Sequence, residues 1–105
     1  MTKEESTFYE IGSKLEGTDK SQMFGKPFFK INGKAFICFF QNEMDFKLDP
    51  ENVKHALTLS GSVLFEPYGK DRQIKEWDQI PGSHYSFWDD FALKSLEYLK
   101  SNKLK

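Results

Sequence analysis

The strongest structural signal in this chain runs from Phe28 to Phe40 and reads Phe28-Phe29-Lys30-Ile31-Asn32-Gly33-Lys34-Ala35-Phe36-Ile37-Cys38-Phe39-Phe40. Two apolar runs flank Asn32-Gly33, the dipeptide that most readily takes the positive φ angles of a type I′ turn. Such a turn has the twist that joins two antiparallel strands, so these residues predict a β-hairpin.

The second arm of this hairpin is apolar on both faces. Alternation along a strand puts one set of side chains on one face, namely Ala35, Ile37 and Phe39. The opposite face then carries Phe36, Cys38 and Phe40. A strand with one wet face would alternate between apolar and polar residues, so we expect a central strand in a fully covered core. A homodimer contact or a ligand groove is the alternative for the Phe36, Cys38 and Phe40 face.

The flanking patterns predict three helices and further strands. Phe8, Ile11 and Leu15 have helical spacing, and Asp49-Pro50 is typical of a helix start. The expected order is α-β-β-β-α-β-β-α: a helix over 3–16, a loop over 18–22, strands over 28–31, 34–40 and 44–48, a helix from 50 to 60, strands over 62–66 and 73–79, and a last helix starting within 83–86. This order predicts an α+β fold with a five-stranded antiparallel sheet and packed helices.

Composition limits the function classes. The chain has 105 residues, which predicts one domain over 1–105 with an ordered core at about 7–100. The net charge of −1 argues against a dedicated nucleic-acid module, because such modules usually carry a basic excess. A single cysteine, no secretory signal and no apolar run of membrane-span length predict a cytoplasmic protein that does not enter the membrane.

The residues capable of catalysis do not form a recognisable constellation. Cys38 sits in the apolar strand, where a thiol has a raised pKa and is inert. His55 and His84 are isolated in the sequence, so we interpret them as surface or capping histidines rather than metal ligands. We therefore expect no catalytic residues, no metal and no cofactor, and hence no enzyme.

Two features of the second hairpin are candidate contact sites. The densest basic set of the chain is Lys70, Arg72 and Lys75, which could follow a phosphate backbone or simply form a solvated turn. Trp77 follows on the predicted outer strand, where it could be a core residue or an exposed stacking platform.

Short motifs through the chain resemble a known family. Met23-Phe24-Gly25, followed by Phe28-Phe29 and then Asn32-Gly33-Lys34-Ala35-Phe36, resembles the N-terminal domain of the TfoX/Sxy proteins. The resemblance continues through Phe46-Lys47-Leu48 and Gly61 to the tryptophan-bearing last helix, and parts of it extend to the related MmcQ/YjbR-like domains. Lys26 stands where a second glycine is common in that motif.

The resemblance implies an α+β fold with a curved antiparallel sheet and no established catalytic residue. It implies a link to regulation of natural competence for TfoX proteins, and DNA binding through paired wings for YjbR-like domains. We expect a stand-alone domain of this kind, without the C-terminal domain of full-length TfoX proteins, acting as a non-enzymatic protein-interaction or regulatory module. The alternatives are a nucleic-acid-binding domain that uses Lys70 and Arg72, and a binder of a small apolar ligand near Phe36, Phe40 and Trp77.

Overall fold

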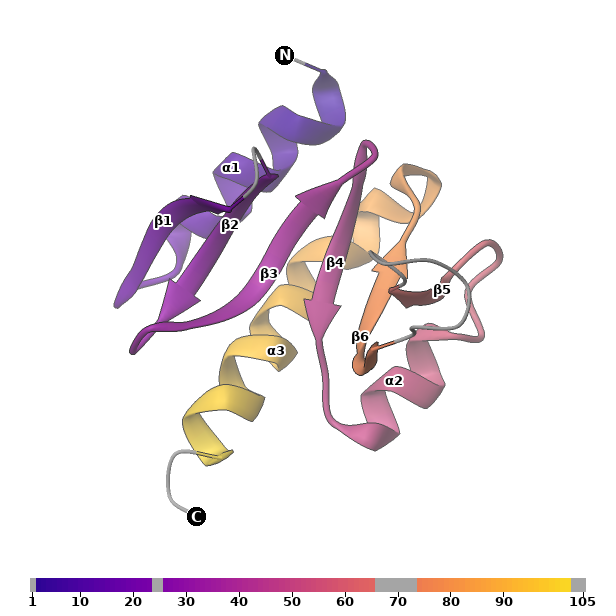
Figure 1. The fold of residues 1–105 in the computed structure, drawn as a ribbon. Coiled ribbons are helices and arrows are strands. Elements are labelled where there is room, and N and C mark those ends of the chain that lie inside the picture. The colour runs from indigo at the N-terminus through magenta and orange to yellow at the C-terminus, as the bar shows by residue number, and fades with distance from the viewer. Residues whose placement is uncertain (1, 24–25, 66–73, 103–105) are drawn as a thin grey trace.

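A computed structural model gives the fold, and it describes residues 2–23, 26–65 and 74–102. The first helix is followed by four strands, a second helix, two further strands and two last helices, as Figure 1 shows. Their bounds are α1 (Lys3–Lys14), β1 (Thr18–Met23), β2 (Lys26–Ile31), β3 (Lys34–Phe40), β4 (Glu43–Lys47), α2 (Pro50–Ala56), β5 (Val63–Phe65), β6 (Ile74–Ile80), the 3₁₀ helix η1 (Gly82–Phe87) and α3 (Trp88–Asn102). The predicted α+β class with an antiparallel sheet is confirmed.

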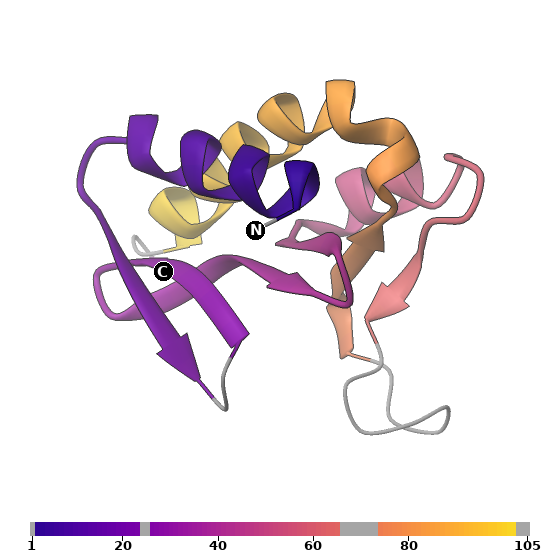
Figure 2. The same cartoon turned by 90° about the horizontal axis from the view of Figure 1, so that it is seen from above.

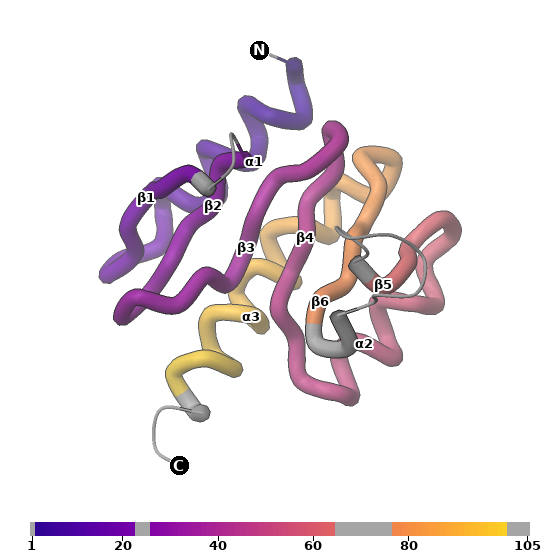
Figure 3. Tube along the Cα trace, viewed as in Figure 1, coloured from indigo at the N-terminus to yellow at the C-terminus, as the bar shows by residue number. Residues whose placement is uncertain are grey.

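The strands of the described residues form one six-stranded antiparallel sheet with the order β1-β2-β3-β4-β6-β5 (Figure 3). The prediction of five strands is wrong, because residues 18–22 belong to the edge strand β1 and not to a loop. β1 reads TDKSQM and carries no apolar alternation, so no pattern in the sequence marks it. Pairing with β2 from Thr18↔Ile31 to Met23↔Lys26 makes it a strand, and its polar composition suits a sheet edge.

Two tight turns set the register of the central strands. Asn32 and Gly33 have φ angles of 52° and 79°, which confirms the predicted turn between β2 and β3. Gln41 and Asn42, with φ angles of 53° and 64°, make a second turn of the same sign pattern between β3 and β4. The two turns together place β3 in the middle of a meander.

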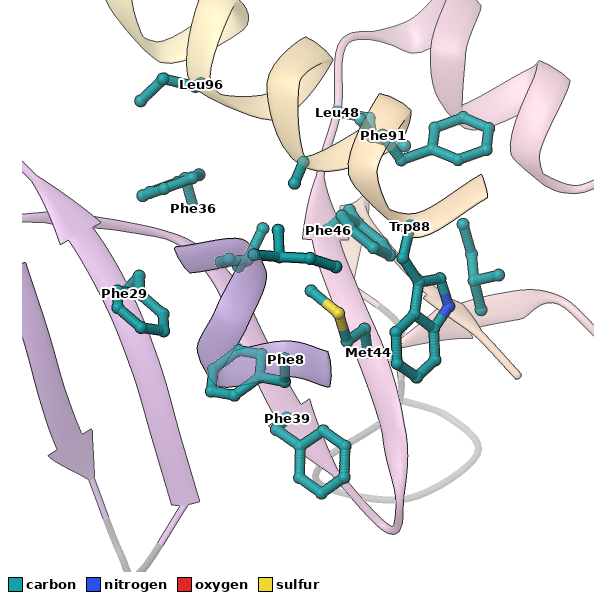
Figure 4. Close-up of a cluster of buried hydrophobic side chains, with 14 of the residues drawn as sticks. Phe8, Phe29, Phe36, Phe39, Met44, Phe46, Leu48, Trp88, Phe91 and Leu96 are labelled. Atoms are coloured by element: carbon teal, nitrogen blue, oxygen red, sulfur yellow. The ribbon is translucent and has the colours of Figure 1, made fainter. Parts of the chain in front are cut away.

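The described helices all lie on one face of the sheet, as the view in Figure 2 shows. The predicted stripe on the last helix is confirmed, since all of its members are buried: Trp88, Phe91, Ala92, Ser95, Leu96 and Leu99. This stripe packs over β3 and β4, while Phe8 of α1 contacts the rings of Phe29 and Phe39 at centroid distances of 5.2 and 5.5 Å. Figure 4 shows these rings gathered between the sheet and the helices, where their burial stabilises the fold.

A β-bulge in β3 redirects Phe36. Phe29 pairs with Ile37 while Lys30 pairs with Ala35, so Phe36 has no partner residue on β2. Phe36 and its neighbour Ile37 are both fully buried. The backbone carbonyl of Phe36 accepts a hydrogen bond of 2.7 Å from the hydroxyl of Ser95, itself buried on α3. The bulge therefore moves an aromatic ring into the core, and α3 satisfies its carbonyl.

Candidate functional site

The face of the sheet that points away from the helices is the candidate site, and we refer to it as the open face. Its centre is one row of direct cross-strand neighbours that crosses all the strands: Ser21, Phe28, Cys38, Asp45, Gln79 and Val63. The adjacent residues Phe29, Ile37 and Met44 are buried toward the helices, which fixes the direction of the row. The row combines apolar, amide, thiol and carboxyl groups.

Asp45 is the most unusual group in this row. Its side chain has 0% exposure although no described helix lies over this face. The thiol of Cys38 donates to Oδ2 of Asp45 at a distance of 3.4 Å. Oδ1 has no hydrogen-bond partner among the residues that the structure describes. Asp45 is thus a buried carboxyl group with one unused acceptor.

The environment of Asp45 opposes its ionisation. Burial raises the pKa of the Asp45 carboxyl well above its usual range, the Cys38 hydrogen bond partly opposes this, and the negative charges of Glu43 and Asp78 raise the pKa further. Burial and the Asp45 charge likewise raise the pKa of the Cys38 thiol far above its ordinary value. The thiol therefore stays protonated, in the direction that its sequence context predicts, and is a poor nucleophile.

Aromatic side chains flank Asp45 on the open face. Phe40 pairs with Glu43 and Trp77 pairs with Lys47, so each ring is a diagonal neighbour of Asp45. Both rings are half-buried. The ammonium of Lys26 lies over the Phe40 ring, 4.8 Å from its centroid. An ammonium group is thus already accommodated against one of these rings.

The structure does not bring the predicted interface set together. Phe36 was expected on one face with Cys38 and Phe40, but the bulge turns it into the core, and only Cys38 and Phe40 remain on the open face. The expectation that helices cover both faces of β3 is also wrong, because the described helices pack on one face of the sheet alone (Figure 2). An apolar groove that includes Phe36 is ruled out by the same burial.

The predicted contact set of the second hairpin falls mostly outside the described residues. Lys70 and Arg72 are not among the described residues. Lys75 lies on β6, but the structure describes only its backbone. Trp77 is described, and the register places it on the open face opposite Lys47. The prediction that its strand is the outer one is wrong, because β6 lies between β4 and the edge strand β5. Of this set, Trp77 alone can be assigned to the site.

The two histidines have structural contacts. His55 is exposed on α2 and packs edge-on against Phe91 at 5.8 Å between ring centroids. Nε2 of His84 lies 2.8 Å from the carbonyl oxygen of Ser60, which ties η1 to the turn after α2. No three His, Cys, Asp or Glu side chains within the described ranges gather closely enough to hold a metal ion.

Among the described residues, two hollows lack Asp45 in their lining, and the second reaches the open face row only at Ser21. One, of about 230 Å³, is lined by Lys3, Glu4, Thr7, Gly82, Ser83 and Tyr85. The other, of about 300 Å³, is lined by Tyr9, Lys20, Ser21, Gln22 and Pro27. Neither includes Phe40 or Trp77, so neither matches the ligand groove that the sequence suggested.

Sequence reasoning missed the two buried carboxyl groups. The alternation in 44–48 placed Asp45 on the polar face of its strand, which predicts exposure. Asp78 shares the helix-covered face with its partner Phe46, is fully buried, and accepts a hydrogen bond from Ser62. Asp45 lies between two apolar neighbours, but this pattern does not distinguish a buried carboxyl group from an exposed one, and Asp78, which precedes Gln79, lacks even that pattern.

Comparison with known proteins adds no relative. No protein-family model matches the chain, and no curated protein matches it significantly. Within the described residues, no helix has the length and apolar character that a membrane crossing requires.

Proposed function

We propose that this chain is a TfoX N-terminal-like domain that works as a non-enzymatic protein-interaction module, with its partner docking on the open face. One observation carries the proposal: the helices of the described residues lie on one side of the sheet, and its other side presents half-buried aromatic rings around a buried carboxyl group with an unused acceptor. Aromatic residues are enriched in protein interfaces, and a buried polar atom without a partner is a reason to look for a ligand.

The chemistry of the site supports binding over turnover. The only thiol of the chain, Cys38, is held in its protonated form beside Asp45. Nucleophilic catalysis needs a nucleophile next to a group that accepts its proton, and a carboxyl group that itself resists ionisation is a poor acceptor. The motif resemblance supports the same class, since that family supplies no established catalytic residue.

Charge complementarity favours a different protein over a second copy of this chain. In a two-fold dimer through the centre of the open face, Asp45 of one copy would meet Asp45 of the other. Two carboxyl groups at that distance cannot both ionise without a large cost, so such a dimer would keep Asp45 protonated, as it is in the single chain. A different partner that brings a hydrogen-bond donor or a positive charge would in addition satisfy the unused Oδ1 of Asp45 and stabilise its ionised form.

The experiment is affinity capture from the cells of origin with matched variants, followed by titration of the captured protein after purification. The open-face variant is Phe28→Ser with Phe40→Ser, and the control is Phe87→Ser with Leu93→Ser, whose side chains are 45% and 47% exposed on the helix side. We expect wild type and control to bind the purified partner equally, and the open-face variant to bind at least tenfold more weakly. Equal binding by all three proteins would refute the docking face, and turnover that depends on Cys38, His55 or His84 would refute the function.

Size-exclusion chromatography with light scattering tests the second copy directly. A monomer is expected at micromolar concentration, and a dimer abolished by the open-face variant would replace the proposed partner with a second copy of the chain. Titration of labelled duplex DNA at low salt tests the nucleic-acid alternative, which predicts salt-sensitive binding that Lys70→Ala and Arg72→Ala weaken.

A further inference from the structure

The geometry points to an arginine side chain of the partner as the group that the open face receives: its guanidinium would enter beside Phe40 and Trp77 and donate hydrogen bonds to Asp45. This inference rests on the proposed function and specifies the chemistry of the partner at that face. In this inference Asp45 accepts the hydrogen bonds of the guanidinium, and the rings of Phe40 and Trp77 lie on either side of it.

The hydrogen bonding of Asp45 leaves room for such a group. A carboxylate has two oxygens that can accept about four hydrogen bonds. Oδ2 of Asp45 accepts one weak bond from the Cys38 thiol, and Oδ1 accepts none among the described residues. A buried carboxyl normally has a charged or hydrogen-bonded partner, because an isolated one is costly to ionise. Nothing that the structure describes supplies that partner.

The neighbouring lysines do not fill the role. Lys47 is on the same strand and the same face as Asp45, and Lys26 lies on the nearby Phe40 ring. Neither forms an ion pair with Asp45 within the described part of the chain, where the Asp90–Lys94 pair on α3 is at 3.2 Å. The described residues therefore include no cation that would stabilise the ionised form of Asp45.

Guanidinium suits the site better than an ammonium group. It is planar, it donates two parallel hydrogen bonds to a carboxylate, and it is more weakly hydrated than ammonium, so burial costs it less. It also stacks on aromatic faces, and Phe40 and Trp77 are both diagonal neighbours of Asp45. Since Asp45 has no exposed surface, side chains on the open face must move when the guanidinium reaches it, and such rotamer changes are common at interfaces.

The test uses the whole chain and three small probes at constant ionic strength, followed by backbone amide NMR. The probes are arginine amide, its neutral isostere citrulline amide, and lysine amide. We expect arginine amide to shift the amide signals of Cys38, Asp45 and Gln79 saturably, with a dissociation constant of about 1 to 10 mM for one side chain. Citrulline amide should bind at least tenfold more weakly, and lysine amide should fall between them.

Variants separate the receptor from its surroundings. Asp45→Asn keeps the shape and removes the ability to ionise on binding, so the saturable shifts should disappear while the spectrum remains that of a folded protein. Glu43→Gln removes a charge from the same strand and face and should leave arginine binding within twofold of wild type. No saturable shift with arginine amide, equal shifts with citrulline amide, or retained binding in Asp45→Asn would each overturn the inference.

A further arm identifies the source of the guanidinium. The capped tripeptide Gly-Arg-Gly should bind more tightly than arginine amide if a protein segment is the partner, and weaker binding by the tripeptide would overturn that assignment. If the probes fail while the Phe28→Ser, Phe40→Ser variant still loses a captured protein, this inference falls and the proposed function stands.

Discussion

Asp78→Asn should remove a pH dependence from the stability of this protein. The Asp78 side chain is fully buried on β6, where Oδ1 accepts a hydrogen bond from the Ser62 hydroxyl and Oδ2 has no partner among the described residues. Burial raises the pKa of Asp78 from 3.8 to about 6, and the Ser62 hydrogen bond opposes the rise. An asparagine at this position retains an oxygen for Ser62 but cannot titrate.

The sign and size of the effect follow from proton linkage. Between pH 4 and pH 6 the folded protein still holds the Asp78 proton, whereas the unfolded chain has lost it. The contribution of Asp78 to stability therefore falls as the pH rises through this window, and it is constant above about pH 7. A pKa difference of about 2 units corresponds to about 3 kcal/mol, which is the share of the unfolding free energy that ionisation of Asp78 removes by neutral pH.

The assay is urea denaturation of wild type and Asp78→Asn at half-unit steps from pH 4 to pH 7.5. The difference between their unfolding free energies should change by about 3 kcal/mol in favour of the variant as the pH rises. Taking the difference cancels the contributions of groups that both proteins share, apart from the part of the Asp45 pKa shift that the Asp78 charge causes. Parallel curves, within about 0.5 kcal/mol, would refute the reasoning and mean that Asp78 titrates in the fold as it does in the unfolded chain.

Three further substitutions test the packing. Gly12→Ala should cost about 1–3 kcal/mol despite the better helix propensity, because an added Cβ would lie 2.2 Å from the ring of Phe29. Ser95→Ala should cost about 1–3 kcal/mol, because it leaves the bulge carbonyl of Phe36 buried without a donor. Phe8→Ala should cost about 3–5 kcal/mol, because it opens a cavity in the aromatic cluster. Urea denaturation at one pH measures all three.

Exposed positions provide the matched controls: Ser13→Ala and Ser6→Ala on α1, and Phe87→Ala on η1. Each should change stability by less than about 0.5 kcal/mol, apart from the modest propensity gain on the helix. A Gly12→Ala protein that is more stable than wild type would contradict the close α1–β2 contact. A Ser95→Ala protein as stable as Ser6→Ala would contradict the role of α3 at the bulge.

Local sequence patterns predicted the elements whose signal is periodic. The Asn32-Gly33 turn took the positive φ angles that the dipeptide favours, and every residue of the stripe on α3 is buried. The edge strand β1 was missed because its polar residues carry no period, and it becomes a strand through pairing with β2. The signals for a turn and for a helix face lie in neighbouring residues of the sequence. Whether a polar segment such as β1 becomes an edge strand depends on the strand with which it pairs.

Some features of this protein follow from the sequence alone, whereas the composition of the open face follows only from the tertiary structure. Sequence alone determined an α+β chain with an apolar central strand and a terminal amphipathic helix, because turn chemistry and periodicity are properties of neighbouring residues. The bulge that moves Phe36 into the core and the burial of Asp45 came only from tertiary structure. Both depend on registers between strands, including that of β4 with β6, more than 30 residues further along the chain. No local pattern encodes such a register, because it is set by how the strands pair and how the helices pack over them.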